Sequence, residues 1–130
     1  NDYSASQILV IAESLGKGEL ALAREDFTAA IGHFTKAVGG QDTLPYTEPP
    51  FWYYPTRQSL GHALLLAEKP AQAETVFRDD LKQYPRNGWS LLGLSLSLEG
   101  QGKNAEASKQ RSRFEKIWQR ADVQLNSSVL

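Results

Sequence analysis

The sequence predicts an all-α protein, built as a right-handed stack of about three antiparallel helical hairpins. Three observations support the helical class: an alanine that recurs at related intervals, apolar residues spaced as on one helix face, and few alternating β-branched runs. With 130 residues, 41% of them hydrophobic and 22% charged, the chain can bury a modest core. We therefore expect residues 1–130 to form a single domain.

The recurring alanines are Ala30, Ala73 and Ala107. Each follows a turn signal, and small side chains at such positions let two helices approach closely. Ala73 and Ala107 are 34 residues apart, whereas Ala30 and Ala73 are 43 apart, which is nine more. The difference predicts a nine-residue insertion between the first two hairpins. It falls in the least helical stretch, residues 39–55.

The first hairpin is expected over residues 6–38. Its first helix contains Gly18, and Asp26 is suited to cap the second helix, because its carboxylate can accept a hydrogen bond from a free N–H in the first turn. Gly39 and Gly40 are expected to end that helix. The apolar residues at helical spacing are Phe27, Ala30, Ile31, Phe34, Ala37 and Val38.

The second hairpin is expected over residues 56–85, with Gly61 in its first helix. Pro70 fits the first turn of its second helix, where the missing N–H costs nothing, and Pro85 is expected to stop that helix. The apolar residues of the second helix are Ala73, Val76, Phe77 and Leu81.

The third hairpin is expected over residues 87–125. Asn87 is suited to cap its first helix, and Gly100 with Gly102 is expected to close it. The final helix should run from about residue 104 to about residue 125 and seal the open end of the stack. Its apolar stripe consists of Ala107, Phe114, Ile117, Trp118, Ala121 and Leu125.

These residues resemble the tetratricopeptide repeat family over most of the chain. In the second hairpin the matching residues are Leu60, Gly61, Ala73, Phe77 and the closing Pro85. The corresponding residues are Gly18, Phe27, Ala30, Phe34 and Ala37 in hairpin one, and Trp89, Leu92, Gly93, Gly102 and Ala107 in hairpin three.

The resemblance implies an α-α superhelix that binds a protein or peptide on its concave face. Hairpin three departs from the pattern, because Arg111 stands where the family has a phenylalanine. A narrower likeness to the C-terminal part of longer bacterial repeat proteins of uncharacterised function implies further hairpins before Asn1, no catalytic residues, and the periplasm rather than the cytoplasm. It is carried by Leu44, Pro45, Tyr46, Glu48, Pro49, Pro50, Trp52, Tyr53, Tyr54, Pro55, Arg57 and the run from Asn87 to Leu91.

The stretch from residue 39 to residue 57 combines four prolines with five aromatic residues. One interpretation is that it folds over the first hairpin as a plug, because its aromatic side chains are worth ~1.5–3 kcal/mol each when buried. The other is an aromatic shelf for a partner, with Arg57 nearby, for which Tyr46, Trp52 and Tyr54 are the candidates. We expect a mixture of the two, in which Trp52 and Tyr53 pack inward and Tyr46 or Tyr54 is more exposed. Arg57 could instead pair with Glu48 and pin the loop.

The first helix of each hairpin is expected to line the concave face. The residues this places there are Leu15, Glu19, Leu22, Gln58, His62, Leu65, Ser90, Leu94 and Ser97. Family members that clamp a C-terminal carboxylate need basic residues and asparagines where this chain has Leu15 and Glu19. A groove of this composition suits an apolar or helical peptide better. The alternative is that these residues only line a longer solenoid.

No enzymatic constellation, metal site or cofactor motif is found in the sequence. Cysteine is absent, and the two histidines, His33 and His62, have no second ligand three or four residues away. The acidic pairs Glu25–Asp26 and Asp79–Asp80 are interpreted as surface charges, because adjacent residues on a helix diverge. No nucleophile elbow or phosphate-binding glycine loop occurs.

Composition also bears on the partner. The net charge of −1 and the absence of an apolar run of roughly 18–20 residues argue against nucleic-acid binding and membrane insertion. The bases of the last helix are interpreted as solvating charges around its apolar stripe.

The prediction is therefore a protein- or peptide-binding scaffold that uses its concave face and its Pro/aromatic loop. Two alternatives stay open: a C-terminal cap that buries its first helix against preceding hairpins of the same chain, or an accessory lid to an enzyme domain of the parent protein.

Overall fold

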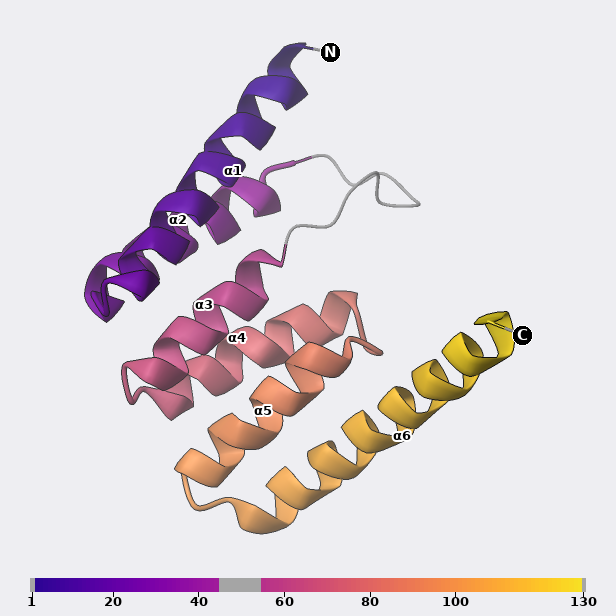
Figure 1. The fold of residues 1–130 in the computed structure, drawn as a ribbon. Coiled ribbons are helices and arrows are strands. Elements are labelled where there is room, and N and C mark those ends of the chain that lie inside the picture. Colours follow the sequence, from indigo (N-terminus) through magenta and orange to yellow (C-terminus); the bar gives the residue numbers. More distant parts are fainter. Residues whose placement is uncertain (1, 45–54, 130) are drawn as a thin grey trace. The chain divides into compact units, whose positions relative to one another are not determined.

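All regular structure in the described part of the chain is helical, which confirms the all-α prediction (Figure 1). The computed structural model describes the backbone of residues 2–44 and 55–129, and the side chains of residues 5–44 and 55–121. The helices are α1 (Asp2–Ala23), α2 (Phe27–Asp42), α3 (Thr56–Leu66), α4 (Pro70–Gln83), α5 (Gly88–Gly100) and α6 (Asn104–Val129).

The chain divides into two compact units of three helices each. Unit 1 is Asn1–Glu68, where α2 packs against both α1 and α3. Unit 2 is Lys69–Leu130, where α5 packs against both α4 and α6. The boundary falls between α3 and α4. Each unit therefore has a middle helix that is covered on two sides.

The three recurring alanines are all core residues. Ala30 in α2 and Ala73 in α4 are 0% exposed, and Ala107 in α6 is 1% exposed. Their burial is the outcome expected for small residues at helix contacts. Larger side chains complete the core around them, including Phe34 in unit 1 and Phe77 in unit 2.

Two glycines set the distance between neighbouring helices. Gly18 of α1 lies against the ring of Phe34 in α2, and Gly93 of α5 lies against the ring of Phe77 in α4. A Cβ atom at either glycine would overlap the ring. The missing side chain therefore provides the space that each phenylalanine fills.

The helix starts follow the sequence signals. The side chain of Asp26 accepts a hydrogen bond from the N–H of Ala29 at 3.1 Å, and Asn87 Oδ1 accepts one from the N–H of Trp89 at 3.2 Å. Pro70 occupies the first turn of α4. These three predictions are confirmed. Caps and first-turn prolines act within one helical turn, so residue type and position are enough to predict them.

The end of α2 corrects one prediction. The helix does not stop at Gly39 and Gly40 but continues to Asp42. A Cβ at Gly40 would lie 3.1 Å from Cγ1 of Ile11, so this glycine serves the close approach of α2 to α1. The helix ends where the hydroxyl of Thr43 donates to the carbonyl oxygen of Gly40 at 2.7 Å.

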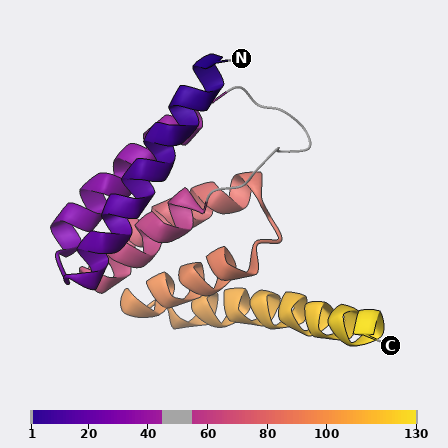
Figure 2. The ribbon, with the colours of Figure 1, turned by 45° about the horizontal axis from the view of Figure 1, so that its top comes forward.

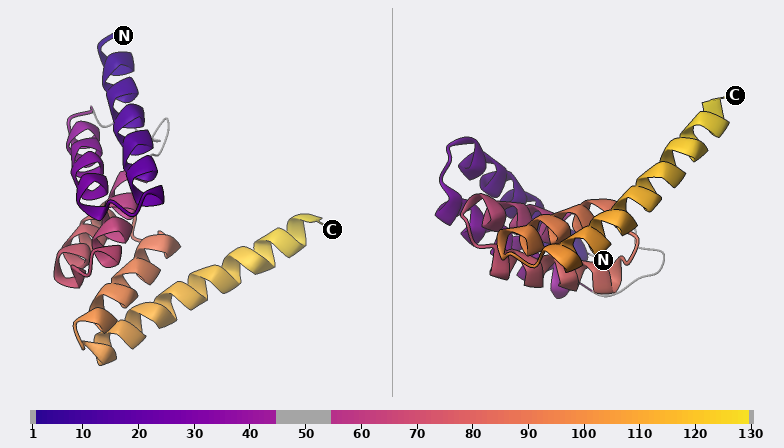
Figure 3. Two further views of the ribbon diagram at one scale, coloured as in Figure 1. Left: turned by 60° about the vertical axis from the view of Figure 1, so that its left-hand side comes forward. Right: turned by 90° about the horizontal axis from the view of Figure 1, so that it is seen from below.

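Helix α6 is much longer than its neighbour α5, with 26 residues against 13 (Figures 2 and 3). The start of α5 lies beside the middle of α6, because a Cβ atom added at Gly88 would lie within 4 Å of Phe114 and Ile117. The later turns of α6 therefore extend past the first residue of α5. Within the described residues, none of the helices has the length and apolarity that a membrane span requires.

Candidate functional site

Three of the ten predicted binding residues, Tyr46, Trp52 and Tyr54, lie outside the described residues. The same holds for Glu48, the partner considered for Arg57. The interpretations of this loop as a plug, a shelf or a lid therefore stay predictions.

The structure places Arg57 at the junction of α2 and α3. Its Nη2 lies 2.6 Å from Oδ2 of Asp42, and its side chain is only 15% exposed. Next to it, the hydroxyl of Thr56 donates to Oε1 of Gln41. These two contacts fasten the start of α3 to the last turn of α2. Arg57 thus has a structural contact within unit 1 that the sequence did not indicate.

The remaining candidates of unit 1 are dispersed over two helices. Glu19 is exposed on α1, and Leu22 is half-buried on the same helix. On α3, Gln58 is half-buried and His62 is exposed. These four side chains thus lie on two different helices.

Ser90 and Leu94 correct the predicted lining of the concave face. They are 0% and 2% exposed, so both belong to the core and a partner cannot reach them. The hydroxyl of Ser90 donates to Oδ2 of Asp80 at 2.5 Å. Because α5 is covered by α4 and α6, few of its positions remain open for binding.

Asp80 corrects the interpretation of the Asp79–Asp80 pair as two surface charges. Asp80 is 3% exposed and also accepts a hydrogen bond from Nδ2 of Asn87 at 2.8 Å. Asp79 is 44% exposed and lies 3.4 Å from Nζ of Lys82, as a surface charge would. The signal was present in the sequence, because Asp80 follows Phe77 by three positions and so shares its helix face.

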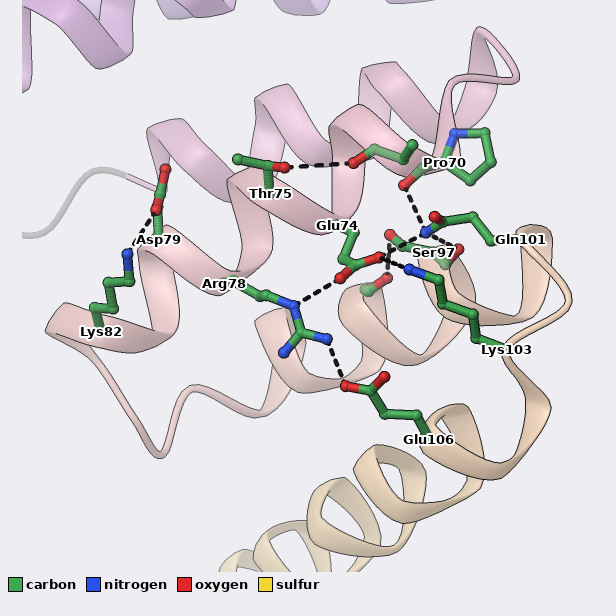
Figure 4. Close-up of polar contacts among 12 residues, drawn as sticks. Pro70, Glu74, Thr75, Arg78, Asp79, Lys82, Ser97, Gln101, Lys103 and Glu106 are labelled. Carbon is green, nitrogen blue, oxygen red and sulfur yellow. Dashed lines mark hydrogen bonds and ion pairs between the residues drawn. The ribbon is translucent and has the colours of Figure 1, made fainter.

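A network of charged and amide side chains joins α4 to the turn after α5 and to α6 (Figure 4). The carboxylate of Glu74 accepts hydrogen bonds from Arg78 Nε at 2.8 Å, Gln101 Nε2 at 2.8 Å and Lys103 Nζ at 3.2 Å. Arg78 also donates from Nη2 to Glu106 at 2.5 Å. Every charge in this network has a partner of opposite sign.

These hydrogen bonds lower the pKa of Glu74 to about 2. The bond from Arg78 has the largest effect, and the bond from Gln101 has the next largest. A carboxylate that stays ionised at neutral pH keeps all three hydrogen bonds. The network therefore fastens α4 to the turn after α5 and to α6.

The most distinctive exposed feature of unit 2 is a pair of tryptophans. Trp89 of α5 is 59% exposed and Trp118 of α6 is 49% exposed. Their rings meet edge to face, with centroids 5.7 Å apart and an interplanar angle of 72°. Phe114 lies beside Trp118 with a centroid distance of 5.9 Å. Each indole is thus held in place by a neighbour while much of its surface stays in water.

An apolar row on α5 continues this pair. Trp89, Leu92 and Leu96 follow one another at intervals of four or fewer residues and share one helix face. Leu92 is half-buried, and Leu96 is 41% exposed. We call Trp89, Leu92, Leu96 and Trp118 the aromatic face. In the sequence, Trp89 belongs to the family pattern and Trp118 to the apolar stripe of the last helix, and neither pattern indicated this exposed pair.

Unit 1 has an exposed apolar surface of its own on α1. Leu9 is 69% exposed and Leu20 is 51% exposed, and the exposed residues Ala12 and Gly16 lie between them on the same side of the helix. We call these four residues the outer face of α1. The opposite side of the helix is packed inward, with Ile11 at 0% exposure.

The charges of the two units differ in sign. Unit 2 contains ten Lys and Arg residues against seven Asp and Glu residues, a net charge of +3. Unit 1 contains four against eight, a net charge of −4. Four exposed bases form one line along α6 at intervals of three or four residues, rather than being spread around the helix. They are Lys109, Arg113, Lys116 and Arg120.

No group of three His, Cys, Asp or Glu residues that could hold a metal ion occurs in the described part of the chain. Comparisons with protein-family models, with curated proteins and with solved structures find no match to the chain.

Proposed function

We propose that the chain is a protein- or peptide-binding module, built as a right-handed stack of tetratricopeptide-like hairpins. The recurring buried alanines and the two glycine–phenylalanine contacts support the repeat character. The observation that carries the binding function is the exposure of Trp89 and Trp118 on the aromatic face.

The aromatic face has the energetic character of a binding surface. Trp89 and Trp118 together leave roughly 200 Å² of apolar surface in water, given 150–250 Å² per aromatic side chain. Covering that area contributes about 5 kcal/mol before the cost of association is subtracted. Tryptophan is also among the side chains most often found as anchors in protein interfaces, because it is large and loses little rotamer freedom.

The shape of the face favours a helical segment of the partner. The row from Trp89 to Leu96 extends about 10 Å along α5, at 1.5 Å per residue. Trp118 on α6 lies beside Trp89, and α6 continues past the start of α5. A helix with apolar residues at intervals of three and four could lay its stripe along this row.

A polypeptide fits this surface better than a nucleic acid does. The nearest members of the basic line, Lys116 and Arg120, are each two positions from Trp118, so they point roughly 160° away from it around the helix. Base stacking on the indoles and phosphate contacts with these bases could not be combined on one surface.

The second candidate function is that of a cap on a longer stack of hairpins. The outer face of α1 favours it, because Leu9 and Leu20 would be covered by a preceding hairpin. Of the other large apolar residues on this helix, Val10 is 46% exposed, Ile8 is half-buried and Ile11 is fully buried, so the open surface is centred on Leu9.

The binding function can be tested with a displayed library of amphipathic helical peptides selected on the wild-type chain. We expect Trp89→Ala and Trp118→Ala each to weaken the selected peptides at least about tenfold, the range for an interface anchor. Leu66→Ala is the matched control, because Leu66 is a 44% exposed apolar residue of unit 1. Peptides that bind all four proteins equally, or a selection that yields no binder, would contradict the proposal.

A further inference from the structure

The four bases in line on α6 have no carboxylate partner, unlike four other bases of unit 2. Those other bases are paired as follows: Arg78 with Glu74 and Glu106, Lys82 with Asp79, Lys103 with Glu74, and Arg111 with Glu99. Within the described residues, no carboxylate forms an ion pair with Lys109, Arg113, Lys116 or Arg120, the four residues of the basic line. Arg113 donates from Nη1 to the neutral side chain of Gln110 at 2.9 Å, which leaves its charge unneutralised.

This arrangement opposes the stability of α6. Like charges three or four positions apart repel each other on a helix surface, and the basic line contains three such pairs in succession. The helix macrodipole does not offset the repulsion, because its favourable effect on cations is confined to the last turn, where α6 has no basic residue. The stability of unit 2 therefore gives no reason for the basic line.

The basic line forms a narrow strip on an open side of α6. Its four positions lie within about 60° of the helix circumference and extend over about 16 Å along the axis. Ala107 and Phe114, which lie against α5, are roughly 130–150° around the helix from the centre of the strip. The strip thus takes no part in the packing of α6 on α5 and is separate from the aromatic face.

The strip is polar. Its four positions include no apolar or aromatic side chain, and the exposed residues along one edge, Ser112 and Gln119, are also polar. A helix that binds a lipid surface needs apolar residues beside its bases, and proteins bind single-stranded nucleic acid by aromatic stacking as well as by phosphate contacts. The composition of the strip therefore favours a partner that is recognised by charge-assisted hydrogen bonds alone, as a polypeptide rich in carboxylates is.

The spacing of the bases matches that of a second helix. The intervals along α6 are four, three and four residues, and their order is the same from either end. A helix with acidic residues at these intervals presents its carboxylates at about 6, 10.5 and 16.5 Å along its axis, as the bases are. Each base then faces an acid whether the two helices run parallel or antiparallel. Charge pairs of this kind select partners between neighbouring helices.

We propose that the basic line binds an acidic helical segment of a partner polypeptide, with carboxylates at intervals of four, three and four residues. The basic line is a second binding surface, on the side of α6 away from Trp118. The proposal therefore goes beyond the proposed function and does not depend on it. Because exposed ion pairs contribute little individually, we expect a dissociation constant in the micromolar to millimolar range.

The test measures the binding of two labelled helical peptides to the full chain by fluorescence anisotropy. The first peptide has four glutamates at intervals of four, three and four residues. The second has the same composition, with its glutamates spread around the helix. At about 0.01 M salt, where charges act over about 30 Å, the first peptide should bind severalfold more tightly than the second. At about 0.15 M salt its affinity should fall at least tenfold, because the screening length shortens to about 8 Å.

A charge-reversed chain identifies the surface. Arg113→Glu together with Lys116→Glu should weaken the first peptide at least about tenfold, because two attractions become repulsions. The matched control is Arg24→Glu together with Lys36→Glu, which makes the same change in net charge at exposed residues of unit 1. The control should change the affinity by less than about threefold.

An exchange of charges separates binding from folding. The first peptide with lysines in place of its two middle glutamates should bind the charge-reversed chain at least about tenfold more tightly than it binds the wild type. The charge-reversed chain should also keep or gain helical signal in circular dichroism, because two of the three like-charge pairs become opposite ones.

Three results would overturn the proposal: equal binding of the two acidic peptides, equal binding of the first peptide to the charge-reversed chain and the wild type, or no recovery with the exchanged peptide. Tighter binding of duplex DNA or of anionic vesicles than of the first peptide, at the same salt, would also overturn it, because the partner would then be a nucleic acid or a lipid surface. Library peptides that require Trp89 and Trp118 on the charge-reversed chain would leave the proposed function standing in each case.

Discussion

At the residue scale, the packing of each unit depends on glycines whose missing side chain is filled by a neighbour. Gly18 receives the ring of Phe34, and Gly93 receives the ring of Phe77. Not every helical glycine has this role. Gly32 of α2 has no atom near the place where a Cβ would stand. The two kinds of glycine should therefore respond in opposite ways to the same substitution.

We expect Gly18→Ala to destabilise the protein by about 1–3 kcal/mol, because the new methyl group overlaps a ring that has little room to move. Gly32→Ala should stabilise it by about 0.5–1 kcal/mol, because alanine loses less backbone entropy in a helix and meets nothing there. Chemical denaturation of both variants measures the difference. Equal effects would mean that the contact with Phe34 does not limit the packing.

The pKa of Glu74 gives a second prediction at this scale. The folded pKa, at about 2, lies below the ordinary value of 4.5. The carboxylate therefore contributes its full stabilisation above about pH 4.5, and that contribution is lost as the pH falls through about 2. The melting temperature of the wild type should fall across this window by more than that of Glu74→Gln. Parallel curves for the two proteins would show that the network does not stabilise unit 2.

At the element scale, Asp80 joins the end of α4 to the start of α5. Its carboxylate accepts hydrogen bonds from Ser90 and from Asn87, the residue that caps α5. We expect Asp80→Ala to cost about 1–3 kcal/mol, because it leaves a buried hydroxyl without its acceptor. Asp79→Ala should change stability by less than about 0.5 kcal/mol, because an exposed ion pair contributes little. Urea titrations of the two variants provide the comparison, and a similar loss in both would contradict the role of Asp80.

Helix starts could be predicted from the sequence, whereas contacts between helices could not. Asp26, Pro70 and Asn87 act within a single turn, so their residue type and position suffice. Gly40 was interpreted as a helix end, but its function depends on Ile11 in a different helix. Asp80 shares the helix face of Phe77, but its burial depends on Ser90 and Asn87, which follow α4 in the chain and donate to its carboxylate.

At the scale of the whole molecule, the alanine period predicted the helical class and the buried positions in both units. The aromatic face could not be predicted in the same way. Trp89 matches a family position and Trp118 lies on an apolar stripe, and neither pattern states how much of the indole stays exposed. Whether such a residue is covered depends on which element lies beyond it, and neither indole of this pair is fully covered. Ser90 and Leu94 were predicted to line the concave face but are buried, because α5 has neighbouring helices on two sides.

The charged residues are distributed unequally between unit 1 and unit 2. A net charge of −1 for the whole chain conceals a negative unit 1 and a positive unit 2. The net charge of the whole chain therefore indicates no strong electrostatic field. The net charges of the two units, taken separately, indicate a negative field for unit 1 and a positive field for unit 2. Any association that joins unlike units should weaken as salt is added.

The most direct test of the account follows the indole N–H signals of Trp89 and Trp118 by NMR during titration with a selected helical peptide. If the aromatic face is the recognition surface, both signals should shift and saturate with the peptide, while the methyl signals of Leu66 stay in place. A peptide that binds the folded chain and leaves both indole signals unchanged would contradict the account.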